Sequence, residues 1–127
     1  MSPPIASSSS FSIILETENL ANADLNGLVN SLASLVNQTM SPTEANEVLV
    51  IDSGDAPPEL LQQLCDRYSW ITVHPAPPAT GYYKAKMLGA QLATGEIVVY
   101  ADSDCVYESR WLENILTAFS QNEPIQI

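Results

Sequence analysis

Two aspartates one residue apart, Asp102 and Asp104, directly follow the apolar run 97–101. A run rich in β-branched residues predicts a strand buried on both faces, and open α/β sheets bind ligands at the carboxyl ends of such strands. If extended geometry continues through Ser103, the two carboxylates share one side of the chain and repel each other unless a cation joins them. Their oxygens suit Mg2+ or Mn2+. The alternative is that both aspartates simply begin a turn.

Two more polar clusters follow predicted strands elsewhere in the chain. Residues 16–19 come after the apolar run 11–15, and residues 52–55 close the run that begins at Glu47. Because parallel strands present their carboxyl ends at the same edge of a sheet, we expect these clusters to meet the aspartate pair there. This convergence favours a metal and ligand site over simple turn chemistry.

The elements that would position these clusters alternate between strand and helix. Apolar residues recur at intervals of three and four in the helical segments, for example at Leu25, Leu28, Leu32 and Leu35. Such alternation predicts an α/β protein, Rossmann-like, with three α/β/α layers and a mainly parallel sheet of about four strands. The predicted strands are 11–15, 47–52, 70–73 and 96–101, and the predicted helices are 20–36, 57–68, 82–94 and 108–120.

The length and composition indicate one folded domain. The chain has 127 residues, of which 46% are apolar and 15% charged. We expect residues 1–10, rich in Pro and Ser, to be a flexible leader, and residues 11–127 to be the domain. Cys65 and Cys105 give neither a zinc spacing nor a disulfide framework, which fits reduced thiols in the cytoplasm. No apolar run reaches the length of a membrane span, although peripheral association with a membrane stays open.

The charge balance restricts the partners. Fifteen acidic residues against four basic ones give a net charge of −11, which argues against nucleic acid as a partner. An anionic small ligand would therefore need local cations. Lys84 and Lys86, which precede the strand 96–101, are candidates, although they could equally be solvated side chains.

Five segments in order resemble the N-terminal, nucleotide-sugar-binding half of family 2 glycosyltransferases with the GT-A fold. No single segment is specific, but their order and spacing are. The resemblance implies a truncated GT-A fold that binds a nucleotide-diphosphate sugar, foremost a UDP-sugar, for transfer to an unknown acceptor. The segments are 13–19, 48–55, 81–89, 93–98 and 100–104, the last followed by Trp111 and Leu112.

The resemblance also implies roles for residues that would hold the nucleotide. The loop Thr17, Glu18 and Asn19 would pack on the nucleotide. Asp52 would contact the base, commonly uracil, and Lys86 would lie near the nucleotide or its phosphates.

By the same resemblance, Asp102 and Asp104 form the D-x-D motif. Asp104 would contact Mg2+ or Mn2+, and Asp102 would contact the metal or the ribose. A divalent ion that bridges both phosphates stabilises the charge that develops on the diphosphate as the glycosidic bond breaks.

The chain departs from the family pattern in three places. Glu16 and Glu18 stand where Pro and an aromatic residue are usual, Ser53 replaces a second Asp, and Lys86 replaces an Arg. One predicted helix and a short tail follow Asp104, so we expect a domain that is incomplete at its C-terminus and lacks the acceptor half. No catalytic base is assigned. The alternative function is a non-catalytic pseudoenzyme or partner-binding fragment, and exposed apolar surface at the missing half would favour self-association.

Overall fold

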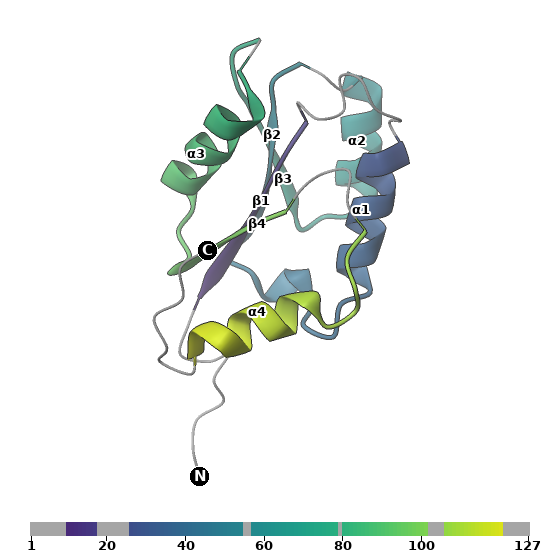
Figure 1. Ribbon diagram of the computed structural model, residues 1–127. Helices are drawn as coiled ribbons and strands as arrows, with labels where there is room; N and C mark the ends of the chain where they lie inside the picture. The colour runs from purple at the N-terminus through teal and green to yellow at the C-terminus, as the bar shows by residue number, and fades with distance from the viewer. Residues whose placement is uncertain (1–9, 18–25, 55–56, 79, 102–105, 121–127) are drawn as a thin grey trace.

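Strands and helices alternate along the whole of the described chain (Figure 1). The computed structural model describes residues 10–17, 26–54, 57–78, 80–101 and 106–120. Its elements are β1 (Phe11–Glu16), α1 (Asn26–Val36), the 3-10 helix η3 (Pro42–Glu44), β2 (Glu47–Asp52), α2 (Pro58–Arg67), β3 (Ile71–Pro75), α3 (Tyr82–Leu92), β4 (Ile97–Tyr100) and α4 (Trp111–Ser120).

The four strands form one parallel sheet in the order β3-β2-β1-β4. The inner strand β1 pairs with β2 and with β4, which precede the other two polar clusters in the sequence. Glu16 pairs with Ile51 of β2, and Ile14 pairs with Tyr100 of β4. The carboxyl ends of β1, β2 and β4 are therefore neighbours at one edge of the sheet, which confirms the predicted α/β class.

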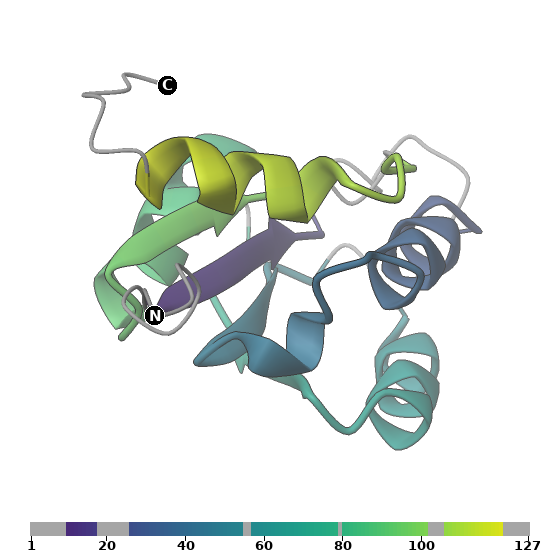
Figure 2. The same ribbon diagram turned by 90° about the horizontal axis from the view of Figure 1, so that it is seen from below.

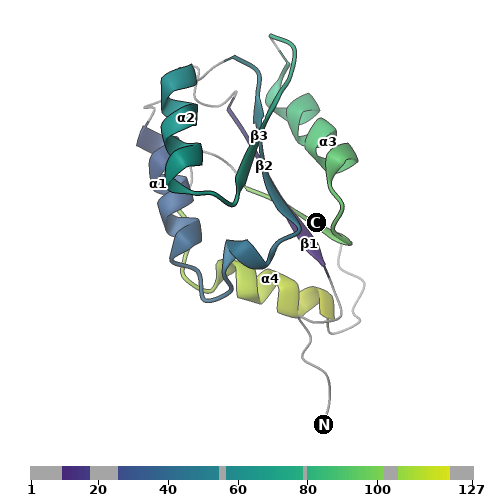
Figure 3. The same ribbon diagram turned by 180° about the vertical axis from the view of Figure 1, so that it is seen from behind.

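Helices cover both faces of the sheet, in three layers (Figures 1 and 3). On one face, Ile13 and Leu15 of β1 pack in a core with Leu32 of α1, Leu64 of α2 and Leu112 of α4. Figure 2 shows α1 and α2 nearly end-on, with α4 lying crosswise to them.

The opposite face of the sheet carries a smaller core under α3. Ile14 of β1 and Leu49 and Ile51 of β2 pack there with Ala85 of α3. Alternate residues of β1 thus enter different cores, as the period-two geometry of a strand requires. None of the helices in the described ranges is long and apolar enough to cross a membrane.

A dense hydrogen-bond network fixes the start of β4 against β1 and β2. The Gly95 amide donates to Ser12 Oγ at 2.9 Å, and Thr94 Oγ1 donates to Glu47 Oε1 at 2.8 Å. Ser12 Oγ itself donates to Glu47 Oε2. A Cβ at Gly95 would lie 2.4 Å from the backbone carbon of Phe11, so only glycine permits this close crossing. The network sets the register of the strand that leads to Asp102.

Several predicted boundaries differ from those of the structure, and two of the differences have local reasons. The third strand extends through His74 and Pro75 instead of ending at Val73. Because β3 is an edge strand, a proline without an N–H is tolerated, and the Ala76 amide continues the pairing to Asp52 O at 2.8 Å.

The fourth helix begins at Trp111 instead of Glu108. The Glu108 carboxylate accepts from the Arg110 amide at 2.6 Å, so this residue precedes the helix and satisfies an amide at its start. For the first helix, α1, the part predicted before Asn26 lies outside the described residues.

Candidate functional site

Thr17 joins the carboxyl ends of β1 and β2. Its side chain is fully buried, and its amide donates to Ile51 O at 3.1 Å. The hydroxyl accepts from the Ser53 amide at 3.3 Å and lies 3.5 Å from Asp52 Oδ1. Two of the residues predicted to hold the nucleotide, Thr17 and Asp52, therefore do lie together.

The turn after β2 orients the Asp52 carboxylate. Gly54, in the left-handed region at φ 91°, donates its amide to Asp52 Oδ1 at 2.9 Å. Asp52 is half-buried, and its second oxygen, Oδ2, has no hydrogen-bond partner within the described part of the chain. That oxygen can accept a hydrogen bond from a ligand N–H.

Lys86 lies beside the strand that leads to the aspartate pair. Its Nζ is 6.0 Å from the centre of the Tyr100 ring, at the carboxyl end of β4. The contact is a cation–π interaction between α3 and β4. The structure thus brings Lys86 to the last residue of β4, on the α3 side of the sheet.

Strand pairing persists up to the residue before the D-x-D motif. The Ala101 amide donates to Ile14 O at 2.9 Å, so the pairing with β1 continues one residue past the end of β4. Asp102 and Asp104 themselves lie outside the described residues, as do Glu18 and Asn19. In the ranges that the structure does describe, no three His, Cys, Asp or Glu side chains gather around a possible metal position.

The segment after the motif is bound to α1 by Gln38, which sequence reasoning missed. The Gln38 amide group donates to Glu108 O at 2.7 Å, and its oxygen accepts from the Leu112 amide at 2.9 Å. The Ser34 hydroxyl accepts from the Tyr107 amide at 3.0 Å. A signal did exist, because the polar residues Ser31, Ser34 and Gln38 recur at i, i+3 and i+7, along α1 and just past its end.

The acidic residues near α4 serve the structure of this segment. Glu113 accepts hydrogen bonds from Thr39 Oγ1 at 2.6 Å and from Arg110 Nη2 at 2.7 Å. These hydrogen bonds lower the pKa of the Glu113 carboxyl, and the one from Thr39 contributes most. Both oxygens of the Glu113 carboxylate therefore accept hydrogen bonds from within this segment.

Curated relatives of the chain are glycosyltransferases. It is 29% identical over 105 residues to N-acetylgalactosaminyltransferase 6 of Drosophila melanogaster, covering 80% of this chain and 16% of the relative. It is 28% identical over 112 residues to mouse (Mus musculus) inactive polypeptide N-acetylgalactosaminyltransferase-like protein 5, covering 84% and 25%. The chain thus spans a quarter or less of the length of these two relatives.

Solved structures with the same fold include glycosyltransferases with bound nucleotides. A mannosyltransferase of Pyrobaculum calidifontis, in complex with GDP-Man and Mn2+, matches with a TM-score of 0.72 at 21% identity, over 91% of this chain and 33% of that one. GalNAc-T7 with UDP, GalNAc and Mn2+ matches with a TM-score of 0.74 at 18% identity, over 90% and 21%. These likenesses establish the GT-A fold.

The family itself follows from the sequence over most of the chain. The model of glycosyl transferase family 2 matches residues 20–127, which include β2 to β4 as well as Asp102 and Asp104. Together with the parallel sheet and its neighbouring strand ends, this match establishes that the chain belongs to glycosyl transferase family 2.

Proposed function

We propose that this chain is the donor-binding part of a glycosyltransferase, which holds a nucleotide-diphosphate sugar with a divalent metal for transfer to an acceptor. The observation that carries the proposal is the contact between Thr17 and Asp52 beside the end of β4. Three strand ends from distant parts of the sequence are brought to one edge, where parallel α/β sheets bind ligands.

The nucleotide base would be recognised by Asp52. Its Oδ1 is held by the Gly54 amide, which leaves Oδ2 to accept an N–H from the base. Uracil and guanine both offer such an N–H, and of the two we propose a UDP-sugar as the donor. The two structural neighbours were solved with GDP-Man and with UDP, which makes GDP the comparison ligand for the test.

The diphosphate would be held by a metal and by Lys86. Carboxylate oxygens of Asp102 and Asp104 suit Mg2+ or Mn2+. The hydrogen bond from the Ala101 amide to Ile14 O holds the residue directly before this pair on β1. The ion would act as a Lewis acid toward the departing diphosphate. In a chain of net charge −11, Lys86 adds a local positive charge on the α3 side of β4.

Calorimetric titration of UDP with and without Mn2+ tests this proposal. We expect Asp104→Ala to lose most of the Mn2+-dependent gain in UDP affinity. Asp52→Asn should weaken UDP binding roughly 10-fold with or without Mn2+, because an amide at this position no longer offers two acceptor oxygens. Asp66→Asn, at an exposed site on α2, is the matched control. A UDP affinity that is unchanged by both Asp104→Ala and Asp52→Asn would contradict the proposal.

A non-catalytic form of the same domain is the second candidate. It is favoured by the 28% identity to a mouse relative that is named as inactive. The two candidates differ in turnover, so release of UDP from a UDP-sugar in the presence of Mn2+ separates them. A pseudoenzyme would bind UDP in the presence of Mn2+ but would release no UDP from a UDP-sugar.

A further inference from the structure

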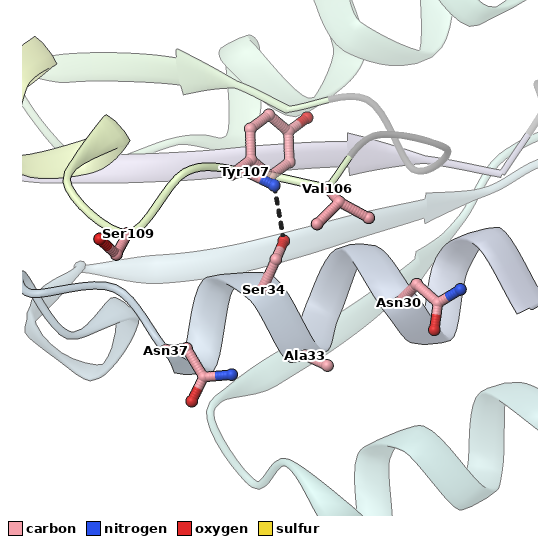
Figure 4. A pocket seen from close by; sticks show the side chains of 7 residues that line it. All are labelled: Asn30, Ala33, Ser34, Asn37, Val106, Tyr107 and Ser109. Carbon is pink, nitrogen blue, oxygen red and sulfur yellow. Dashed lines mark hydrogen bonds between the residues drawn. The ribbon is translucent and has the colours of Figure 1, made fainter.

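A groove runs between α1 and the segment that follows the D-x-D strand (Figure 4). Its volume is about 350 Å3. One wall is formed by Val106, Tyr107 and Ser109. This wall begins two residues after Asp104 in the sequence, a separation that the chain can span by at most about 7 Å.

The other wall is a polar stripe along α1 and its C-terminal turn. Asn30, Ala33, Ser34 and Asn37 are spaced at i, i+3, i+4 and i+7, which places them on one side of a helix. The Asn30 and Asn37 side chains are exposed, and neither carboxamide has a hydrogen-bond partner in the described ranges. Ala33 between them leaves room for a ligand.

Hydrogen bonds along its length hold the two walls together. The Tyr107 amide donates to Ser34 Oγ at 3.0 Å, as the dashed line in Figure 4 shows. Further along, the Thr39 amide donates to Ser109 O at 2.9 Å, and Gln38 donates to Glu108 O at 2.7 Å. The groove is therefore formed before any ligand arrives, as is usual for binding sites.

The lining of the groove is uncharged in a chain that is otherwise strongly acidic. Carboxamides and hydroxyls can both donate and accept hydrogen bonds, which is also the property of the hydroxyl groups of a sugar. Val106, 71% exposed, adds apolar surface suited to the C–H face of a pyranose ring. A phosphate or a basic peptide would find no counter-charge among these lining residues.

We propose that this groove binds a neutral pyranose unit of the acceptor. The inference rests on the proposed function, because an acceptor must reach the donor sugar held beside the D-x-D motif. The groove would supply an acceptor subsite from the same domain that holds the donor. Asn30 and Asn37 would bind the hydroxyl groups, and the wall at Val106 would contact the ring.

Amide spectra of the 15N-labelled chain, titrated with sugars, test the proposal. The probes are the methyl pyranosides of glucose, galactose, mannose and N-acetylgalactosamine. We expect at least one of them to shift the side-chain amide signals of Asn30 and Asn37. The double variant Asn30→Ala/Asn37→Ala should weaken that binding at least tenfold, and Ala33→Leu, which fills the groove and keeps both carboxamides, should weaken it as well. Asn114→Ala on the exposed side of α4 is the matched control.

Parallel titrations separate this inference from the donor site. Because both asparagines are exposed and Ala favours helix, the double variant should fold, with UDP and Mn2+ binding unchanged. UDP binding without any glycoside shift in the groove overturns the acceptor subsite alone. Glycoside binding without UDP binding overturns the donor function and keeps the groove as a sugar site. Groove shifts with the neutral peptide N-acetyl-Ala-Ala-amide, and with no glycoside, would assign it to a peptide instead.

Discussion

At the scale of single residues, Glu47 shows how one carboxylate secures the strand that leads to the D-x-D motif. It accepts from the Ser12 hydroxyl and from both the amide and the hydroxyl of Thr94. Partial burial opposes ionisation, but these hydrogen bonds outweigh it and lower the pKa of Glu47 below its ordinary value of 4.5. The ionised form therefore stabilises the fold.

Glu47→Gln should make stability less dependent on pH in the acid range. Because the folded-state pKa lies below the unfolded value, the contribution of Glu47 is complete above the unfolded pKa and is lost as pH falls through the folded one. We expect the variant to be less stable than wild type at pH 7 and the difference to shrink below about pH 4.5. Urea unfolding between pH 7 and pH 3 measures this. A difference independent of pH, or one equal to that of the exposed control Glu59→Gln, would contradict it.

The sequence alone identified only some of the polar residues that matter at this scale. Asp52 was found because it ends an apolar strand, and Thr17 because it follows another. Glu47 and Gln38 were missed as structural residues because their partners are distant in sequence: Thr94 is 47 residues from Glu47, and Leu112 is 74 residues from Gln38. The nucleotide-binding roles of Thr17, Asp52 and Lys86 stay predictions, as do the metal-binding roles of Asp102 and Asp104.

At the scale of elements, the buried carboxamide of Gln38 joins the end of α1 to the start of α4. Gln38 donates to two carbonyls, those of Ser34 and Glu108, and accepts from the Leu112 amide. Apolar periodicity predicts that both helices pack on the sheet, and the structure agrees, with Leu32 and Leu112 fully buried. Periodicity carries no information about which polar group satisfies the first amides of α4.

Gln38→Met should destabilise the protein by about 2–4 kcal/mol, because it leaves a buried amide and a carbonyl without partners. Thermal and urea unfolding measure the loss. Gln63→Met, at an exposed position of α2, is the control and should change stability by less than about 0.5 kcal/mol. Equal stability of the two variants would show that Gln38 does not join the helices as described.

At the scale of the whole molecule, the alternation of strands and helices was sufficient to predict the parallel sheet. The order of the strands in the sheet could not be derived in the same way, because alternation does not say which strands pair with the two edges of β1. Residues 1–9 of the predicted leader lie outside the described residues, whereas Ser10 accepts hydrogen bonds from the amides of Ile97 and Glu96. Cytoplasmic localisation stays a prediction.

Self-association is also a whole-molecule prediction, and α3 offers a surface for it. Tyr83 is 68% exposed and Met87 47% exposed, one helical turn apart. If this pair contributes to contact between copies, Tyr83→Ser/Met87→Ser should shift the sedimentation profile toward monomer at high concentration. Val36→Ser, which removes an exposed valine of α1, is the control. A profile that is monomeric for wild type would refute the prediction.

The position of β1 at the centre of the sheet has a consequence for biosynthesis. Phe11, its first residue, pairs with Ile97, so this partner is translated long after β1 itself. Contacts of such large sequence separation form late and slowly during folding. On the ribosome, the nascent chain would hold β1 and β2 together with one edge of β1 still open. The second edge of β1 could be paired only after the segment through Ala101 has left the exit tunnel.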